Sequence, residues 1–258
     1  MSTNPSDVAL RHASIVDITR RAGSVTVEEL ARTLDVSAQT IRKDLTALEK
    51  RALLARAHGR ATASSGTDNL PYAERRTLAV AAKAAIGAAA AALVEDGASL
   101  FLNIGTTTEA IARHLVDHRG LMVITNNLNV VDILADRPGI EVIAAGGRVR
   151  PADRAVVGSV AMDFLRNFKV DVALIGASAI EAGGDFLDFD VDEVQVSQTI
   201  IRQARRIILA VDATKLDRRA PVRIGGLADV DCVVIDRAPD ALLRACAEAE
   251  VRLIETGG

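Results

Sequence analysis

The stretch EELARTLDVSAQTIRKDLTALEK, residues 28–50, carries two helical patterns joined by a short turn. Residues 28–34 form the first pattern and residues 38–50 the second, because each repeats apolar side chains at helical intervals. A further helical pattern spans residues 8–21. Three helices with a short turn between the last two have the spacing of a helix-turn-helix.

The second helix of this pair has one apolar and one polar side. Ile41, Leu45 and Leu48 recur at i, i+4 and i+7 and should pack inward. Ser37 precedes the helix and is placed to cap it. The polar side then faces solvent, where a recognition helix meets base edges and phosphates, and a two-stranded wing follows at residues 53–60. The candidate DNA-binding residues are Ser37, Gln39, Thr40, Arg42, Lys43, Arg56, His58 and Arg60.

Charge is distributed unevenly along the chain. The net charge is −3, yet residues 1–60 carry ten Lys/Arg and seven Asp/Glu, whereas the remainder carries 21 and 27. The small N-terminal part is therefore basic and the larger part acidic, as in a DNA-facing module on an acidic body. The alternative is an amphipathic three-helix unit whose Lys and Arg only decorate solvated faces.

Length and composition predict two folded domains. The 258 residues are 49% hydrophobic and 25% charged, which is typical of a globular chain. We expect a winged helix-turn-helix at residues 1–62, a small and polar linker at residues 63–74, and an α/β ligand-sensing domain at residues 75–258.

Several other classes of protein do not fit the sequence. No run approaches the roughly 18 apolar residues of a membrane span, and the first residues lack the apolar core of a signal peptide. A cytoplasmic protein with no membrane partner is therefore expected. Cys232 and Cys246 are isolated from each other and from His, which predicts reduced structural thiols. His114 and His118 share a helix face without a third ligand, so neither a metal nor a cofactor is expected.

The C-terminal part alternates apolar strands with helices. SLFLN, LMVIT and RIILAVD, which begin at residues 99, 121 and 206, are apolar almost throughout, as strands buried on both faces are. Helices are expected between such strands, for example at residues 76–95 and 192–205. The pattern predicts a parallel or mixed sheet covered by helices, and ligands of such sheets bind beyond the C-terminal strand ends.

Small and polar residues recur where these strands end. After Asn103 the chain passes through Gly105 into a helix that begins with three threonines. Glycine permits close backbone approach and a helix start offers unpaired N–H groups, which suits a phosphate; the alternative is a tight turn with threonine caps. The ammonium of Lys215 is either a contact for an anionic ligand or a surface charge. The candidate ligand-binding residues at strand ends are Asn103, Gly105, Thr106, Thr107, Thr108, Asn126, Asn127, Gly146, Gly147, Gly176 and Lys215.

The segment EAGGDFLDFDVD, residues 181–192, places two glycines before aromatic and acidic residues. It is either a lid over the ligand site or an ordinary surface loop. If it is a lid, a β-branched residue at Gly184 should leave folding intact and change the response to ligand.

These motifs resemble the DeoR family of transcriptional regulators. Residues 32–49 and ARAHG at residues 55–59 are similar to its winged helix. SLFLNIGTTTEAIARHL, VITNNLNVVDIL, AAGGRVR, FLDFDVDEVQV and ILAVDATKL are most similar to the glycerol-3-phosphate regulon repressor branch, and the resemblance spans about residues 9–240. It implies a sensor domain like that of sugar-phosphate isomerases, with Glu193 among the effector-binding residues.

The resemblance also implies a function. Members of this family are operator-binding repressors, usually homo-oligomers such as dimers or tetramers, that leave double-stranded DNA when a phosphorylated polyol or sugar binds. Family members often carry Asp at the position of Asn103, Lys at that of Ser197, and Gly at those of Ala52 and Arg60. Because two of these changes bear on ligand recognition, glycerol 3-phosphate is a hypothesis for this chain. Arg60 adds a cation near DNA, which should steepen the salt dependence of binding.

Two other functions fit part of the pattern. A sugar-phosphate isomerase-like enzyme with a DNA-binding appendage needs a positioned base, but Asn103 at the cradle cannot accept a proton near neutral pH, which leaves Glu193 and Asp212. An architectural DNA binder gives no reason for polar groups to converge at one sheet edge. We therefore expect a regulator without catalytic residues, in which ligand lowers operator affinity through a two-state linkage.

Overall fold

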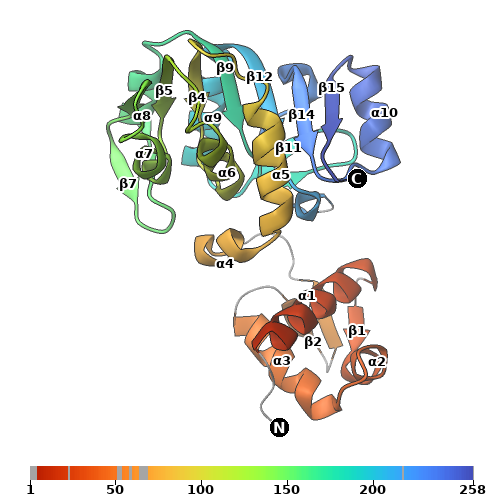
Figure 1. Cartoon of the computed structure of the whole chain (residues 1–258). Helices are drawn as coiled ribbons and strands as arrows, with labels where there is room; N and C mark the ends of the chain where they lie inside the picture. Colours follow the sequence, from red (N-terminus) through yellow and green to blue (C-terminus); the bar gives the residue numbers. More distant parts are fainter. Residues whose placement is uncertain are drawn as a thin grey trace. The chain divides into compact units, whose positions relative to one another are not determined.

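A computed structural model describes residues 5–22, 24–50, 54–57, 60–63, 69–216 and 218–257. The chain divides into two compact units, Met1–Pro71 and Tyr72–Gly258. Figure 1 draws both units, coloured along the sequence.

The first unit combines three helices with a small antiparallel sheet (Figure 1). Its elements are α1 (Pro5–Ala22), β1 (Ser24–Thr26), α2 (Val27–Thr33), α3 (Ala38–Lys50), β2 (Leu54–Ala57) and β3 (Arg60–Ala63). The strand order is β1-β3-β2, so β3 pairs with both neighbours. The predicted two-stranded wing is present as β2 and β3, but its second strand lies at residues 60–63, beyond the predicted bounds of 53–60. β1 is a strand that the sequence did not predict.

Local capping fixes where α2 and α3 begin. The Thr26 hydroxyl accepts the backbone N–H of Glu29 at 3.2 Å, and the Glu29 carboxylate accepts the backbone N–H of Thr26 at 2.8 Å. This reciprocal pair is a capping box. The Ser37 hydroxyl accepts the backbone N–H of Thr40 at 3.1 Å, so the predicted cap of α3 is confirmed.

The core of the first unit forms on the inward side of α3. Ile41, Leu45 and Leu48 are buried there with Leu30 of α2, and Leu34 packs partly buried against the same cluster. Burial of each such side chain is worth about 1.5–3 kcal/mol. The predicted orientation of α3 is therefore confirmed, and its other side is left to solvent.

A seven-stranded sheet forms the centre of the second unit (Figure 1). Its strands are β4 (Ser99–Leu102), β5 (Leu121–Thr125), β6 (Ile140–Ala144), β9 (Val170–Ile175), β12 (Ala204–Ala210), β14 (Cys232–Ile235) and β15 (Arg252–Glu255). The order is β15-β14-β12-β9-β4-β5-β6, and every neighbouring pair is parallel. The predicted helix-covered sheet is confirmed, although β15 was not predicted.

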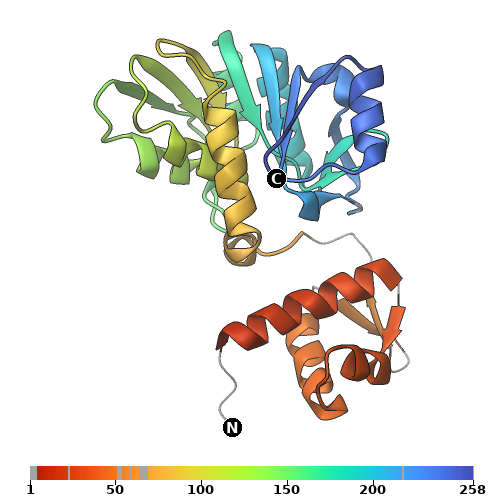
Figure 2. The same ribbon diagram turned by 45° about the vertical axis from the view of Figure 1, so that its right-hand side comes forward.

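Helices cover both faces of this sheet, as Figure 2 also shows. The helices are α5 (Val80–Ala91), α6 (Thr106–His114) and α7 (Leu128–Leu134) on one face, and α8 (Ser159–Leu165), α9 (Val191–Arg202) and α10 (Asp240–Glu248) on the other. Side chains alternate along β4, so Leu100 and Leu102 join the core beneath α5 and α6 while Phe101 joins the opposite core. The two faces thus hold separate apolar cores.

The start of the second unit differs from the single helix predicted at residues 76–95. A short helix, α4 (Tyr72–Thr77), precedes α5, and Ala79 between them has φ +51°. A left-handed residue cannot continue an α-helix, so the two helices are distinct. Consequently α4 occupies the end of the segment that was expected to be linker.

Residues 181–192 run through a second, smaller sheet: residues 181–185 form a turn, residues 186–188 form a strand, and α9 begins at Val191. The strands of this sheet are β10 (Ala179–Ile180), β11 (Phe186–Asp188) and β13 (Val222–Gly225), in the order β10-β11-β13. Gly184 in the β10–β11 turn is buried at φ +91°, and a Cβ there would lie 2.4 Å from the Leu227 side chain. The expectation that a β-branched residue at Gly184 leaves folding intact is therefore wrong.

Another hairpin, β7 (Arg148–Arg150) with β8 (Ala155–Val157), follows β6.

Cys232 and Cys246 are buried and unbridged, as predicted, and burial raises the pKa of both thiols. Within the described ranges, no helix is long and apolar enough to cross a membrane. The same residues contain no group of three or more His, Cys, Asp or Glu side chains that could hold a metal ion.

Candidate functional site

The exposed side of α3 carries the side chains predicted to contact DNA. Gln39, Arg42 and Lys43 are exposed, as is Ser37, whereas Thr40 is half-buried and hydrogen-bonded to the Ser37 hydroxyl at 2.8 Å. Amide, hydroxyl and cationic groups thus share one helical face, as base edges and phosphates require.

The predicted DNA-binding set also includes the wing, and one of its α3 members, Arg42, has a nearby acidic side chain. Arg42 lies 3.6 Å from Glu28, with both side chains mostly exposed, so the pair is weak and Arg42 can exchange this partner for a phosphate. Arg56 and Arg60 lie on the wing strands β2 and β3. His58 falls outside the described residues.

Asp44 is a residue of this unit that sequence reasoning missed. Its carboxylate is 6% exposed and accepts from Arg11 Nε at 2.5 Å, with His12 Nε2 at 3.1 Å. The contacts tie α1 to α3 and therefore help to orient the recognition helix. The only sequence signal is an acid three residues after buried Ile41, on the inward face.

The order of the strands reverses direction between β4 and β9, which makes their C-terminal ends the switch point of the sheet. From β4 the chain proceeds outward to β5 and β6 on one side, while β9, β12, β14 and β15 lie on the other. Ligands of open parallel sheets bind where the order reverses in this way. Asn103 and Gly105 follow β4, and Gly176 follows β9, so these predicted residues lie at the switch point.

The start of α6 is shaped for an anion. Gly105 is its N-cap at φ +136° and ψ 154°, a conformation that favours glycine, and makes no side-chain cap hydrogen bond. Thr106, Thr107 and Thr108 are buried in the first turn, and the Thr108 hydroxyl donates to the Gly105 carbonyl at 2.8 Å. The cap residue therefore offers no side-chain acceptor to the backbone N–H groups of this first turn, and an anion could accept hydrogen bonds from them.

The neighbouring strand end, after β5, leaves two buried polar atoms without partners in the described structure. Asn126 donates to the Val156 carbonyl at 3.1 Å, but its Oδ1 has no partner. Asn127 accepts the backbone N–H of Asn129 at 3.0 Å, but its Nδ2 has no partner. Buried unsatisfied groups of this kind are uncommon, and a polar ligand would satisfy them.

Gly146 and Gly147 follow β6 and are both exposed. Gly147 has φ +144°, and a Cβ there would lie 3.1 Å from Val156 of β8. The chain thus needs glycine at this position to turn from β6 into the β7–β8 hairpin, which suffices to explain Gly147.

Lys215 is buried rather than a surface charge. It lies after β12 in a short 3₁₀ turn and is 5% exposed. Burial lowers the pKa of Lys215 to about 7, although Asp212 opposes the shift and further cations, Arg75 among them, assist it. Asp212 itself is fully buried, and its Oδ2 lacks a partner within the described residues. A buried amine with this pKa is suited to take a proton when an anion binds.

Glu193 belongs to an ion cluster that the sequence did not predict. Arg150 of β7 donates to Asp153 at 2.6 and 2.9 Å, to Asp190 at 2.6 Å and to Glu193 at 2.6 Å. Burial, assisted by Asp188, raises the pKa of Glu193, and the Arg150 charge opposes that shift. Arg150 therefore joins the β7–β8 hairpin to the start of α9.

Asn103 contacts Ser197, the other residue that the sequence analysis singled out as bearing on ligand recognition. Asn103 Nδ2 donates to the Ser197 hydroxyl at 2.8 Å, and that hydroxyl donates to the Glu193 carbonyl at 3.0 Å. Asn103 Oδ1 accepts the backbone N–H of Ile104 at 2.7 Å. Asn103 and Ser197 thus form one neutral, buried, hydrogen-bonded pair.

A second set of missed residues lies on α4, α5, α6 and α7. The set consists of Tyr72, Arg75, Lys83, Glu109 and Asn129. Lys83 is 4% exposed within an alanine-rich helix, and burial lowers its pKa. Tyr72 was missed because it lies in residues 63–74, which were expected to be a linker, and Arg75 directly follows that segment.

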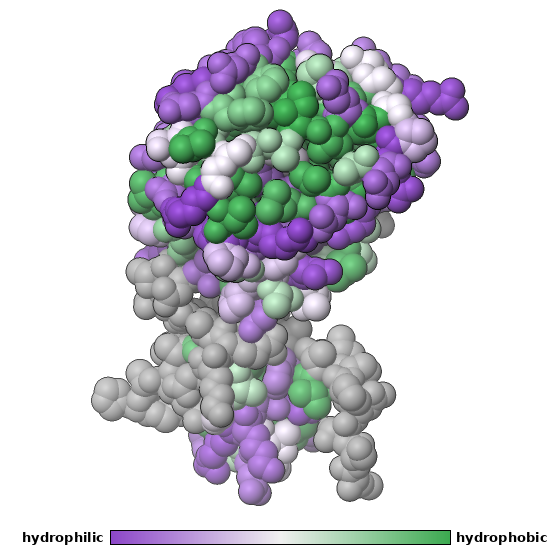
Figure 3. Space-filling model, turned by 90° about the vertical axis from the view of Figure 1, so that its left-hand side faces the viewer, coloured by the Kyte–Doolittle hydropathy of each residue, from purple (hydrophilic) through white to green (hydrophobic). Residues whose placement is uncertain are grey.

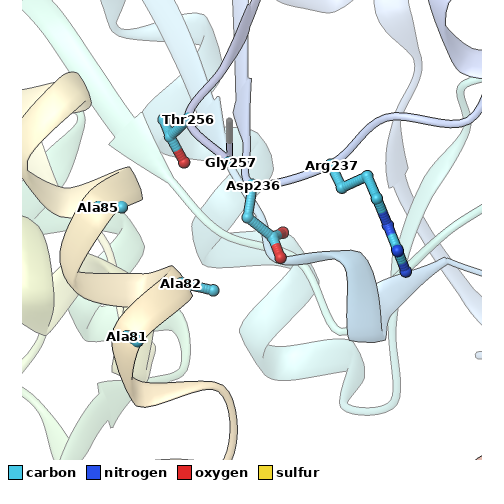
Figure 4. Close-up of a pocket in the computed structure, with 7 residues that line it drawn as sticks. All are labelled: Ala81, Ala82, Ala85, Asp236, Arg237, Thr256 and Gly257. Atoms are coloured by element: carbon cyan, nitrogen blue, oxygen red, sulfur yellow. The ribbon is translucent and has the colours of Figure 1, made fainter.

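Two open hollows in this unit are lined by other residues. One, of about 390 Å³, is lined by α5 and by the chain after β14 and β15 (Figure 4). Its lining residues are Ala81, Ala82, Ala85, Asp236, Arg237, Thr256 and Gly257. The other, of about 530 Å³, lies at the N-terminal strand ends, beside Gly97, Gly120 and Gly139. None of the predicted effector-binding residues lines either hollow.

Comparison with family models decides the relationship of this chain. Residues 11–67 match the DeoR-like helix-turn-helix domain, and residues 78–237 match the DeoR C terminal sensor domain. The chain belongs to the DeoR family. The recognition helix and the buried polar strand ends therefore lie in the two domains that define the family.

Relatives in this family are similar over most of their length. The chain is 37% identical over 250 residues to the glycerol-3-phosphate regulon repressor of Haemophilus influenzae, covering 97% of this chain and 98% of that protein. It is 37% identical to the protein of the same name from Escherichia coli, covering 89% and 91%. A solved ribose 5-phosphate isomerase from Methanocaldococcus jannaschii aligns with 53% of this chain and 54% of its own, at 18% identity and a TM-score of 0.39.

Proposed function

We propose that this DeoR-family protein is a transcriptional repressor that binds operator DNA and is released by a phosphorylated polyol or sugar. The observation that carries the proposal is the switch point after β4 and β9, where α6 starts without a side-chain cap. The same unit holds the buried Lys215 and buried polar atoms that have no hydrogen-bond partner among the described residues. The exposed polar face of α3 supports the DNA-binding half.

Glycerol 3-phosphate is the first candidate effector because two similar relatives are named as repressors of its regulon. The phosphate would take the start of α6, with Lys215 as its counter-charge. Asn126, Asn127, Gly176 and Glu193 would then face or support the polyol. We infer that the site binds its ligand without transforming it, because both candidate bases are engaged: Glu193 accepts from Arg150, and Asp212 accepts the backbone N–H of Thr214 at 3.1 Å.

A fluorescence-anisotropy titration tests this proposal. The full chain is titrated onto labelled DNA from its own promoter region at fixed salt, with and without glycerol 3-phosphate, other triose, polyol and hexose phosphates, and their unphosphorylated parents. One phosphate should weaken binding while its parent has no effect. Tight binding that no phosphate alters would remove the sensor assignment, and absence of binding to any promoter DNA would remove the repressor assignment.

Replacing Arg42 should weaken operator binding without harming the fold. Arg42→Ala removes one phosphate or base contact, which is expected to lower affinity about tenfold and to reduce the salt slope by about one. Arg119→Ala is the matched control, because it removes an exposed cation from the second unit. Equal affinities of the two variants, measured by anisotropy at several salt concentrations, would exclude Arg42 from the DNA interface.

We also propose that the second unit self-associates through the side that carries β6, β7 and α8. Figure 3 shows hydrophobic side chains gathered on this face, where Val149 is 44% and Val160 is 63% exposed. β6 is an edge strand of the main sheet, and exposed strand edges and apolar patches favour pairing. A second copy is the expected occupant, because helix-turn-helix proteins read two half-sites as dimers.

Charged residues on this face should dissociate the oligomer. The double variant Val149→Glu, Val160→Glu is expected to reduce the molar mass measured by light scattering to that of one chain. Leu243→Glu, at a 39% exposed position on α10, is the control and should keep the wild-type mass. A monomeric wild type, or an unchanged mass in the double variant, would contradict the proposed interface.

A further inference from the structure

Helix α4 is bound to the candidate effector site by its Tyr72 side chain. The Tyr72 hydroxyl donates to Glu109 at 2.8 Å, and Asn129 Nδ2 donates to the Tyr72 oxygen at 2.9 Å. Glu109 is 2% exposed and follows directly after the three threonines of α6. Burial and the Glu109 carboxylate raise the pKa of Tyr72 to about 12, so the hydroxyl remains a donor. Tyr72 therefore connects α4 to the helix whose start forms the anion cradle.

Arg75 connects the same helix to the ion cluster. Its guanidinium lies 3.7 Å from Asp153, and its side chain is only 12% exposed. Asp153 is shared with Arg150, which also holds Glu193. The backbone carbonyl of Arg75 accepts the buried ammonium of Lys83. Arg75 is thus a buried cation placed among the charged groups of the strand ends.

The partners of Arg75 leave it able to take a ligand. The 3.7 Å separation from Asp153 exceeds a hydrogen bond, and Arg75 Nε is buried without a hydrogen-bond partner in the described part of the chain. Asp153 is already satisfied by the two hydrogen bonds from Arg150. Arg75 is also close enough to Lys215 and Glu193 to lower the pKa of both. A planar guanidinium in this state is suited to bind phosphate with two parallel hydrogen bonds.

We propose that Arg75 binds the anionic group of the effector, so that α4 moves or stiffens when the ligand binds. This inference rests on the proposed effector site and adds the residue that transmits its occupancy. α4 is the element of the second unit nearest in sequence to the helix-turn-helix. A ligand that binds an α4 cation biases the position of this helix, and linkage then requires operator affinity to depend on the same contact.

The test compares neighbouring arginines on the same helix. Arg75→Met removes the proposed contact, and Arg76→Met is the control, because Arg76 is exposed and, like Arg75, lies near the Tyr72 ring, 5.9 Å from its centroid. Calorimetric titration of the full chain with glycerol 3-phosphate should show affinity reduced about 10- to 100-fold in Arg75→Met and unchanged in Arg76→Met. Arg75→Lys should restore part of the loss, since it keeps the charge but not the fork.

Hydrogen exchange distinguishes a role of Arg75 in ligand binding from a role in folding alone. Glycerol 3-phosphate should change the exchange of amides 72–78 in the wild type and in Arg76→Met, but not in Arg75→Met at equal site occupancy. Thermal unfolding without ligand checks that each variant is folded. If the wild type binds neither glycerol 3-phosphate nor any other phosphate that alters operator binding, the proposed function fails. If it binds while Arg75→Met and Arg76→Met behave alike, only the role of Arg75 is overturned.

Discussion

Lys215→Met should shift the response of operator binding to 10- to 100-fold higher concentrations of phosphorylated ligand and leave ligand-free operator affinity unchanged. The side chain is 5% exposed at the strand ends, far in sequence from the recognition helix, and methionine fills a similar volume without the charge. Loss of a charged hydrogen bond of about 1.5–3 kcal/mol corresponds to a 10- to 100-fold loss of ligand affinity. Anisotropy titrations with and without the active phosphate measure both quantities.

The pH dependence of ligand binding separates a Lys215 contact from a nonspecific loss. Because the pKa of Lys215 is about 7 in the free protein, the amine is largely neutral at pH 8. A bound dianion favours the ammonium, so binding should take up a proton and weaken as pH rises above 7. Calorimetry at pH 8 in buffers of different ionisation enthalpy detects that proton. Proton uptake that persists in Lys215→Met would assign it to another group.

Stability has the opposite pH dependence. The folded-state pKa of Lys215 lies below its ordinary value of 10.5, so the unfolded chain binds more protons between pH 7 and 10.5. The contribution of Lys215 to the free energy of unfolding therefore rises with pH in that window. Lys169→Met is the matched control for both experiments, because Lys169 is exposed at the other end of the sheet.

Sequence reasoning succeeded where the relevant contacts are local. The cap at Ser37 lies three residues from its partner, and the inward face of α3 follows from a helical repeat. The strands were predictable because a strand that is buried on both of its faces requires a continuous run of apolar residues. By contrast, α4 was missed because nothing in its composition shows that Tyr72 and Arg75 have buried partners 37 and 78 positions onward.

The candidate site was predictable in outline and not in its electrostatics. Strand ends can be found from the sequence, and the sheet brings Gly105 and Gly176 together, as expected for parallel strands. Arg150 could not be found in this way, because its partners lie 3, 40 and 43 residues away in the sequence. Likewise, Asn103 and Ser197 are 94 positions apart in the sequence, so the hydrogen bond between them is visible only in the three-dimensional structure.

Arg150→Met should destabilise the second unit by about 3–5 kcal/mol, because it removes one partner of a largely buried ion cluster. The side chains of Asp153 and Glu193 are 8% and 11% exposed, so water cannot replace the lost guanidinium. Arg148→Met, two residues away on the same strand, removes a pair with Asp192 whose side chains are 66% and 45% exposed. That control should change the free energy of unfolding by about 0–1 kcal/mol.

The difference between these variants should also depend on pH. Without Arg150 the pKa of Glu193, already raised by burial, rises further, so the folded state holds a proton that the unfolded chain releases. The destabilisation in Arg150→Met should therefore be smaller at pH 5 than at pH 8, whereas that in Arg148→Met should hardly change. Urea unfolding of the full chain at both pH values, followed through the transition of the second unit, measures this. Equal and small losses in both variants would mean that solvent reaches the cluster and that Arg150 does not hold the hairpin to α9.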